Sequence, residues 1–252
     1  MTVGTERRNH VGIVEMRDPP HNFLSVEQVQ EVADALESFD ADVNVRSAVL
    51  CAEGRSFCAG ANFTPAERSG AANEPNALYL QAARLCDIGI PFVAAVHGPA
   101  IGGGLGLAMT ANFRVTCPEA RFSANFVKLG IHQGFGLSVT LPEVLGPSKA
   151  ALVLLTGRRF KGDEATQIGL ADICVATDEV RERAIELATE IAEGAPLAIR
   201  SINATLRAGL ADRVRAATKH EADEQARLFA TEDSREGVRS VNERRTGNFQ
   251  GR

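Results

Sequence analysis

Residues 97–109 read HGPAIGGGLGLAM and follow the apolar run PFVAAV, so three adjacent glycines lie between an expected strand and an expected short helix. This layout is typical of phosphate-binding loops. A P-loop, however, requires Lys and Ser or Thr directly after its last glycine, and residues 105–109 provide neither. The third glycine of a GxGxxG dinucleotide motif is also absent. The segment therefore does not indicate a nucleotide site.

Backbone N–H groups offer another chemistry for the same glycines. The first N–H groups of a helix have no acceptor within the helix, and its dipole favours negative charge beside them. Glycines let a substrate carbonyl approach these donors, which could then stabilise an enolate or another oxyanion. A second backbone-rich segment, RSFCAGANF at residues 55–63, also follows an expected strand. Two such loops could supply one N–H each.

The elements that would position the two loops alternate between strands and helices, as expected for an α/β core. Ser25 and Gln28 have the spacing of a capping box at the first helix, and Gly157 is a typical residue for ending a later one. From about residue 177 the pattern is helical to the end. The expected strands are 11–17, 46–52, 91–96, 113–117 and 171–177, and the expected helices before the tail are 25–42, 77–90, 104–111 and 148–157.

Length and composition favour a folded soluble protein. The chain has 252 residues, of which 44% are hydrophobic and 23% charged, and its formal net charge of −5 argues weakly against a nucleic-acid surface. The five cysteines form no CxxC motif, which is typical of a reducing compartment. No apolar run suggests a signal peptide or a membrane span. We therefore expect a cytoplasmic protein with no metal site.

Six segments that follow one another along the chain can be compared with known families as a set. They are VEMRDPPHNFLS, AVLCAEGRSFCAGANF, IPFVAAVHGPAIGGGLGLAM, ARFSANFVKLGI, LTGRRFKGDEATQIGLADICV and DSREGVRSVNERRTGNF. Together they resemble the crotonase, or enoyl-CoA hydratase/isomerase, superfamily. The resemblance implies an α/β spiral of ββα repeats over residues 1–195 and a C-terminal helical module over residues 196–252 that packs in a homotrimer or homohexamer. It also implies an acyl-CoA thioester as the partner, with coenzyme A as part of the substrate and no other cofactor.

The same resemblance assigns roles to residues of both loops. By motif position, the two N–H groups that polarise the thioester carbonyl belong to Ala59 and Gly103. Phe57, Ala61 and Asn62 would line the path of coenzyme A, with Asn62 in place of the usual Asp. The C-terminal segment, through Arg244, Arg245 and Phe249, would reach a neighbouring coenzyme A site.

Both glutamates of the hydratases in this family are missing. The first position is Gly106 and the second is Phe126, which we expect to contact the substrate instead. Neither residue can transfer a proton, so neither the two-glutamate hydration nor the single-glutamate isomerisation follows from this sequence. Decarboxylation, in which the leaving carboxylate itself generates the enolate, is one candidate reaction. Thioester hydrolysis is another, less favoured because it requires a base.

Few other side chains are candidates for the chemistry. His132 is a candidate acid or base, because imidazole titrates near pH ~6.5, although it could simply bond to loop backbone. Lys128 could pair with a substrate carboxylate or be a solvated surface residue, and Glu143 is expected on a helix surface. Tyr79 is expected to be buried with its hydroxyl bonded. The alternative hypothesis is that the chain is a non-catalytic acyl-CoA-binding protein, which keeps the pocket but catalyses no reaction.

Overall fold

The apolar runs of the first half of the chain form a six-stranded sheet. The computed structural model describes residues 2–62 and 75–252, so the end of the loop predicted at 55–63 lies outside the described residues. Strand order is β1-β2-β3-β4-β6-β9, with β1 antiparallel to β2 and the other neighbours parallel. The strands are β1 (Val3–Arg8), β2 (Val11–Met16), β3 (Ser47–Ala52), β4 (Phe92–Val96), β6 (Phe113–Thr116) and β9 (Ile173–Cys174).

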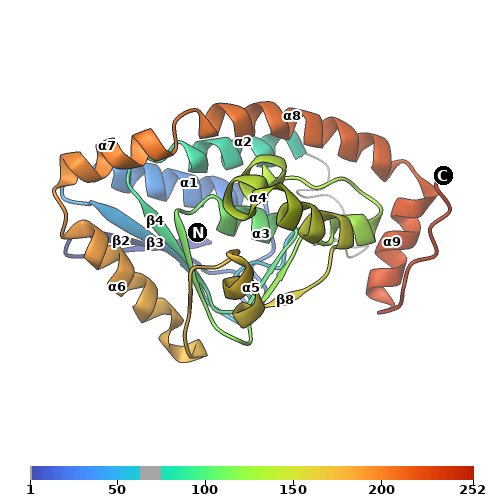
Figure 1. Ribbon diagram of the computed structural model, residues 1–252, viewed down its shortest axis with the longest axis horizontal. Helices are drawn as coiled ribbons and strands as arrows, with labels where there is room; N and C mark the ends of the chain where they lie inside the picture. Colours follow the sequence, from blue (N-terminus) through green and yellow to red (C-terminus); the bar gives the residue numbers. More distant parts are fainter. Residues whose placement is uncertain (1, 63–74) are drawn as a thin grey trace.

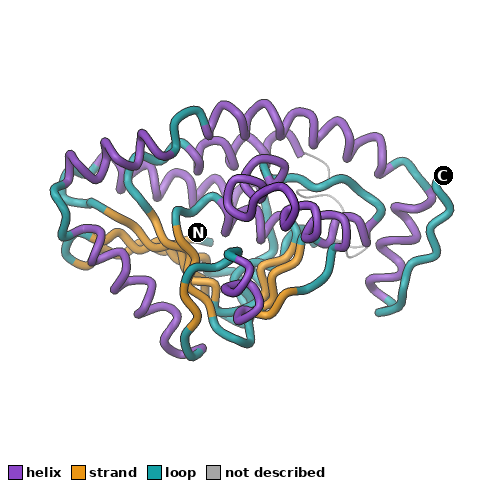
Figure 2. The backbone as a smooth tube through the Cα atoms, in the orientation of Figure 1, coloured by secondary structure: helices purple, strands orange, loops and turns teal. Residues whose placement is uncertain are grey.

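A second, three-stranded sheet is made of very short strands. It contains β5 (Pro99–Ile101), β7 (Arg121–Ser123) and β8 (Phe160–Lys161) in the order β5-β7-β8. Strand β5 is parallel to β7, and β7 is antiparallel to β8. Figure 2 shows these strands beyond one end of the larger sheet. The second sheet was not predicted, because strands of two or three residues are too short to show a periodic pattern.

Helices cover the larger sheet and extend beyond it. Helices α7 and α8 run along one side of the molecule, and α9 lies beside the C-terminus at the opposite end from α7 (Figure 1). Helix α8 packs against α2 and α4, while α6 packs against β3, β4 and β6. The helices are α1 (Val26–Ala41), α2 (Pro75–Cys86), α3 (Gly103–Met109), α4 (Leu137–Thr156), α5 (Gly162–Ile168), α6 (Val180–Ala192), α7 (Pro196–Leu206), α8 (Leu210–Phe229) and α9 (Glu232–Asn242), with 3-10 turns η1 (Asn125–Leu129) and η2 (Thr177–Glu179).

The expected α/β class and the helical tail are confirmed, with differences at helix ends. Ser25 Oγ accepts a hydrogen bond from the Gln28 N–H at 3.0 Å, but the buried Gln28 amide has no partner among the described residues. Only half of the predicted capping box therefore forms. The last strand, β9, precedes α6, and only helices follow, with α7 starting at Pro196.

Helix α4 begins eleven residues before the helix predicted at 148–157. Its backbone leaves helical geometry at Gly146 (φ 73°), and Pro147 follows as the first residue of the second half. Gly157, at φ 52°, ends the helix as predicted. The whole of α4 is long and apolar enough to cross a membrane. Each half, however, is shorter than the ~20 residues that a span requires.

Candidate active site

The glycine loop is fixed between the second sheet and helix α3. Strand β5 ends at Ile101, and the Gly102 N–H donates to the Ser123 carbonyl of β7 at 2.8 Å. Gly102 has a φ of +57°, a left-handed conformation that favours glycine. This turn places Gly103 as the first residue of α3. The Gly103 N–H has no acceptor within residues 2–62 and 75–252, so it is a free donor.

The second loop lies directly against the first. Cys58 forms an isolated parallel bridge with Ala100, because its N–H donates to Pro99 O and its carbonyl accepts from the Ile101 N–H, both at 3.0 Å. An added Cβ on Gly60 would lie 2.5 Å from Ile101 O and 3.8 Å from Gly103 N. The backbone at residue 60 is therefore in close contact with the start of α3.

Ala59 does not have the free N–H that was predicted for it. Its N–H donates to the His21 carbonyl at 3.0 Å, so this group already has a backbone acceptor, and the prediction is wrong for this structure. Two residues later, the Ala61 N–H has no acceptor among the residues that the structure describes. Ala61 and Gly103 thus provide the pair of free backbone donors that the sequence assigned to Ala59 and Gly103.

Both donors lie at the wall of a cavity of about 310 Å³. Among the described residues that line it there is no Asp, Glu, His or Cys, and Arg159 is the one charged side chain. Amide side chains and apolar groups make up the rest of the described lining. The lining residues are Phe23, Ala59, Gly60, Ala61, Asn62, Ile101, Gly102, Gly103, Asn125, Phe126, Leu129, Arg159, Val238, Val241 and Asn242.

The position of the first missing glutamate is filled by Phe135. An added Cβ on Gly106 would lie 2.6 Å from Phe135 Cβ and 3.0 Å from its ring. Both residues are buried, and Phe135 has a φ of +60°, a conformation unusual for an aromatic residue. The structure therefore has no room for a carboxylate side chain at this point of α3.

The predicted substrate-binding residues divide into two groups. Asn62, Ala61 and Phe126 line the cavity. The Phe57 side chain is fully buried and does not line the cavity, so its predicted contact with coenzyme A is wrong for this structure. Lys128 lies exposed on η1 and is also absent from the lining.

His132, the candidate acid or base, lies away from the cavity lining. Its Nδ1 is 2.8 Å from the Gln133 carbonyl, and its ring centroid is 5.6 Å from that of His220 on α8. Gly130, in the left-handed conformation (φ 68°), ends η1 between Phe126 and His132. His132 is thus a backbone-bonded loop residue, the alternative that the sequence left open.

Helix α8 holds the loop that carries Phe135. The Tyr79 hydroxyl donates to Gln225 Oε1 at 2.6 Å, and Gln225 Nε2 donates to the His132 carbonyl at 2.8 Å. The buried Glu221 carboxylate accepts from the N–H groups of Gly136 at 2.9 Å and Ser138 at 3.0 Å. Burial raises the pKa of Tyr79 well above its usual range, so this hydroxyl is a structural donor.

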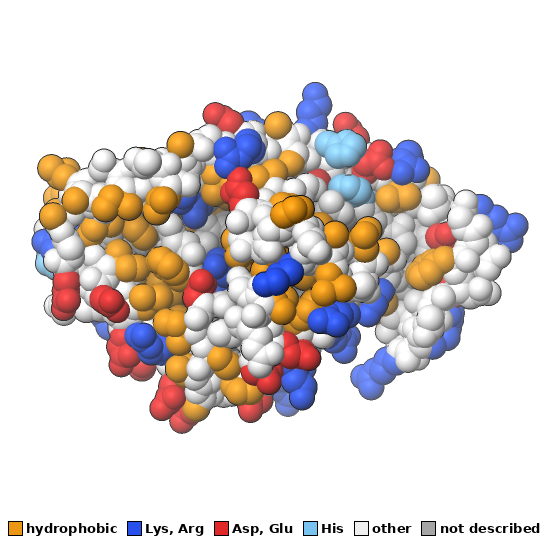
Figure 3. Space-filling view, viewed as in Figure 1, with side chains coloured by type: hydrophobic (Ala, Val, Ile, Leu, Met, Phe, Trp, Pro, Cys, Tyr) orange, Lys and Arg blue, Asp and Glu red, His pale blue; other side chains and the backbone are white. Residues whose placement is uncertain are grey.

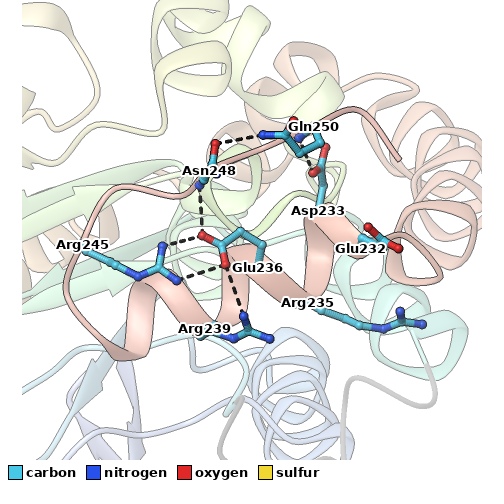
Figure 4. A pocket seen from close by; sticks show the side chains of 8 residues that line it. All are labelled: Glu232, Asp233, Arg235, Glu236, Arg239, Arg245, Asn248 and Gln250. Carbon is cyan, nitrogen blue, oxygen red and sulfur yellow. Dashed lines mark hydrogen bonds and ion pairs between the residues drawn. The ribbon is translucent and has the colours of Figure 1, made fainter.

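The wall of the cavity opposite the two loops comes from α9. Val238, Val241 and Asn242 line the cavity, and α9 packs against η1. The C-terminal segment folds back along the other side of α9, where charged side chains surround a second cavity of about 560 Å³ (Figure 4). There Glu236 binds Arg245 and accepts from the Asn248 N–H at 3.0 Å. Asp233 accepts from the N–H groups of Gln250 and Gly251.

No other reactive group reaches the cavity from the described part of the chain. Burial raises the pKa of the Cys58 thiol to about 12, so this sulfur stays protonated near neutral pH. Within residues 2–62 and 75–252, no three His, Cys, Asp or Glu side chains gather as metal ligands would. The Ala61 and Gly103 N–H groups are thus the polar elements best placed to act on a bound molecule.

Comparison with known proteins gives one consistent family. Residues 6–252 match the family model described as enoyl-CoA hydratase/isomerase. A probable enoyl-CoA hydratase of Bacillus subtilis is 32% identical over 96% of this chain and 95% of its own length. A crotonyl-CoA hydratase of Syntrophomonas wolfei is 34% identical over 90% of this chain and 89% of its own length. The crystal structure of an enoyl-CoA hydratase/isomerase from Pseudoalteromonas atlantica superimposes with a TM-score of 0.86 at 25% identity, covering 99% of this chain and 100% of that one.

Proposed function

The chain belongs to the enoyl-CoA hydratase/isomerase family, and on this premise we propose that it processes acyl-CoA thioesters by binding the thioester oxygen with the N–H groups of Ala61 and Gly103. The observation that carries the proposal is the pair of free donors on two adjoining loops beside one cavity. Donors held in place before the reaction stabilise charge that develops on the oxygen. Both groups are backbone, so the device requires no particular side chain.

The reaction that fits this site best is decarboxylation of a malonyl-type thioester. The bond between Cα and the carboxylate carbon breaks, CO2 leaves, and the bonding electron pair forms the enolate whose oxygen the two N–H groups bind. The enolate carbon then takes a proton from water. No protein base takes part, which agrees with Gly106 and Phe126 at the positions of the two hydratase glutamates.

Two other outcomes are distinguishable from decarboxylation. Hydration or thioester hydrolysis requires a group that activates water, and the described lining contains no carboxylate or imidazole. A non-catalytic acyl-CoA-binding protein would use the same cavity and donors without turnover.

Two carboxylates of the segment that follows Asn62, Glu67 and Glu74, lie outside the described residues. The variants Glu67→Gln and Glu74→Gln therefore test whether either carboxylate takes part.

The experiment incubates the purified protein with malonyl-CoA, methylmalonyl-CoA and crotonyl-CoA and follows the products by mass spectrometry. We expect loss of CO2 from a malonyl-type thioester and no hydration of crotonyl-CoA. Efficient hydration that Glu67→Gln or Glu74→Gln abolishes would contradict the proposed reaction. Tight binding without turnover of any thioester would favour the binding protein. Failure to bind any of them would overturn both readings.

We also propose that the protein assembles as a homotrimer or homohexamer, as its family resemblance implies. Large apolar side chains are exposed on α4 and α7, including Leu155 (75%), Leu197 (82%) and Leu206 (79%). Figure 3 shows hydrophobic side chains gathered over both helices. Exposed apolar surface of this kind is typical of subunit contacts. Sedimentation analysis of the wild type and of Leu197→Glu tests the assembly, because a charge at the contact should dissociate it.

A further inference from the structure

Arg159 is the one charged side chain among the described residues that line the cavity. Its place follows from the second sheet. Strand β7 pairs with β8 so that Phe122 faces Phe160, the residue after Arg159. Ser123 ties the segments together, since its carbonyl accepts from the Gly102 N–H and its hydroxyl donates to Gly157 O at 3.2 Å. The three short strands thus bring the glycine loop, Phe126 and Arg159 to the same cavity.

The Arg159 guanidinium has no hydrogen bond or ion pair with any residue that the structure describes. Its neighbour differs, because the Arg158 guanidinium lies 4.2 Å above the centre of the Phe160 ring and is absent from the cavity lining. Most other arginines of the described chain form ion pairs, such as Arg114 with Asp172 and Arg200 with Asp40. Arg159 is therefore a cation that faces the cavity with no counter-charge from residues 2–62 and 75–252.

The neutral groups around Arg159 favour an anionic group as its binding partner. The other described residues of the lining are neutral, with Asn125 and Asn242 as the amides on η1 and α9. A guanidinium presents several N–H donors in a plane, which matches the two oxygens of a carboxylate or of a phosphate. No described lining residue supplies the opposite charge, so an anionic group of the bound molecule is the partner that fits this guanidinium.

We propose that Arg159 is a specificity-determining residue that binds an oxyanion of the substrate, either a carboxylate on the acyl chain or a phosphate of coenzyme A. The proposal rests on the proposed function, because it assumes that acyl-CoA thioesters occupy this cavity. Where the anion is the carboxylate that leaves, its charge disappears as the bond breaks. The contact then stabilises the bound substrate more than the transition state, so its loss raises KM and does not lower kcat.

The test compares Arg159→Gln with its matched control Arg158→Gln, which removes an adjacent arginine outside the cavity. Equilibrium affinities are measured by calorimetry for succinyl-CoA and butyryl-CoA, which differ chiefly by the terminal carboxylate. The same two acyl groups on pantetheine remove every phosphate from the ligand. We expect Arg159→Gln to weaken one class of ligand about tenfold, as for a partly exposed charged hydrogen bond, and Arg159→Lys to recover part of the loss.

The pattern of losses identifies the anion. Weaker binding of succinyl-CoA, with butyryl-CoA unchanged, assigns the acyl carboxylate. Equal weakening of both CoA thioesters, with no effect on the pantetheine thioesters, assigns a phosphate. If Arg159→Gln weakens no ligand more than Arg158→Gln does, the role of Arg159 is refuted while the proposed function stands. If the wild type binds none of these thioesters, the proposed function fails and this inference fails with it.

Discussion

The two sides of the cavity differ in composition: one consists mainly of loop backbone, and the other consists of side chains of α9. On one side, the loops that carry Ala61 and Gly103 are joined to each other by backbone hydrogen bonds between Cys58 and the residues of β5. On the other side, α9 contributes Val238, Val241 and Asn242, and its outer surface is held to the C-terminal segment by Glu236 and Asp233. The reacting side is thus half-buried backbone at Ala61 and Gly103, and the outer surface of the covering side carries a network of charges.

Because of this difference, the positions of the backbone donors should be less sensitive to substitution and solution conditions than the contacts of α9. Backbone donors keep their positions as long as the strands and α3 keep theirs, so substitutions of nearby side chains act on the chemistry only through shape. The covering side depends on contacts that salt and pH alter. We expect changes on the reacting side to have large effects on folding or turnover, and changes on the covering side to have small, condition-dependent effects.

The largest effect is expected from Gly106→Glu, which forces a carboxylate into the space of Phe135. The added Cβ would lie 2.6 Å from Phe135 Cβ, and both positions are buried. Overpacking together with a buried charge should cost about 3 kcal/mol or more of the free energy of unfolding. Urea titration measures this loss. The same substitution in a Phe135→Gly background should cost clearly less, and an equal cost in both backgrounds would contradict the steric account.

A smaller loss is expected from Glu221→Ala, which breaks the contact between α8 and the loop that carries Phe135. The N–H groups of Gly136 and Ser138 lose their acceptor, and the Gly136 bond is fully buried. Leaving such donors unpaired should lower the free energy of unfolding by about 2–4 kcal/mol. Glu224→Ala is the matched control on the same helix, since Glu224 pairs with Arg227 at the surface. Similar melting temperatures for the two variants would argue against the loop-holding role of Glu221.

The smallest effect is expected where the C-terminal segment binds α9. The bond from Arg245 holds the pKa of the Glu236 carboxyl at about 2, below its usual 4.5. Because the folded pKa is lowered, this carboxylate contributes fully above pH 4.5, and its contribution is lost as the pH falls towards 2. Arg245→Gln should therefore speed hydrogen exchange at the Asn248 N–H near pH 7 without changing the main unfolding transition. Unchanged exchange at Asn248 would show that Arg245 does not hold the segment.

On the reacting side, the sequence predicted the loops correctly but not every residue that acts in them. The glycine loop follows from local pattern, because a strand, a glycine turn and a helix adjoin in the chain. The role of the Gly103 N–H and the missing carboxylate at Gly106 were implied by the family resemblance. Ala59 was chosen wrongly because its acceptor, His21 O, lies 38 residues away in the chain and leaves no local signal. His132 is six residues after Phe126, but the turn at Gly130 directs it towards α8.

The sequence pattern did not predict which residues of the covering side face the cavity. The helical periodicity indicated α9, but not that Val238 and Val241 would face the cavity of the same chain. Arg158 and Arg159 are adjacent and identical in type, and only the pairing of β7 with β8 and the stacking of Arg158 on Phe160 separate their environments. Such distinctions depend on contacts between distant segments, which no single stretch of residues records.

The most direct test of the account is the removal of one backbone donor without a change of side-chain chemistry. A Cβ on Gly103 would lie 2.5 Å from Leu24 Cδ1, so both variants are made in a Leu24→Ala background that provides space. Gly103→Ala keeps the N–H and Gly103→Pro removes it, at the first helical position, where proline is tolerated. On the thioester that the wild type processes fastest, we predict a kcat about 100-fold lower for Gly103→Pro than for Gly103→Ala, with both proteins folded. Equal kcat values for the two folded variants would contradict the claim that the Gly103 N–H binds the thioester oxygen.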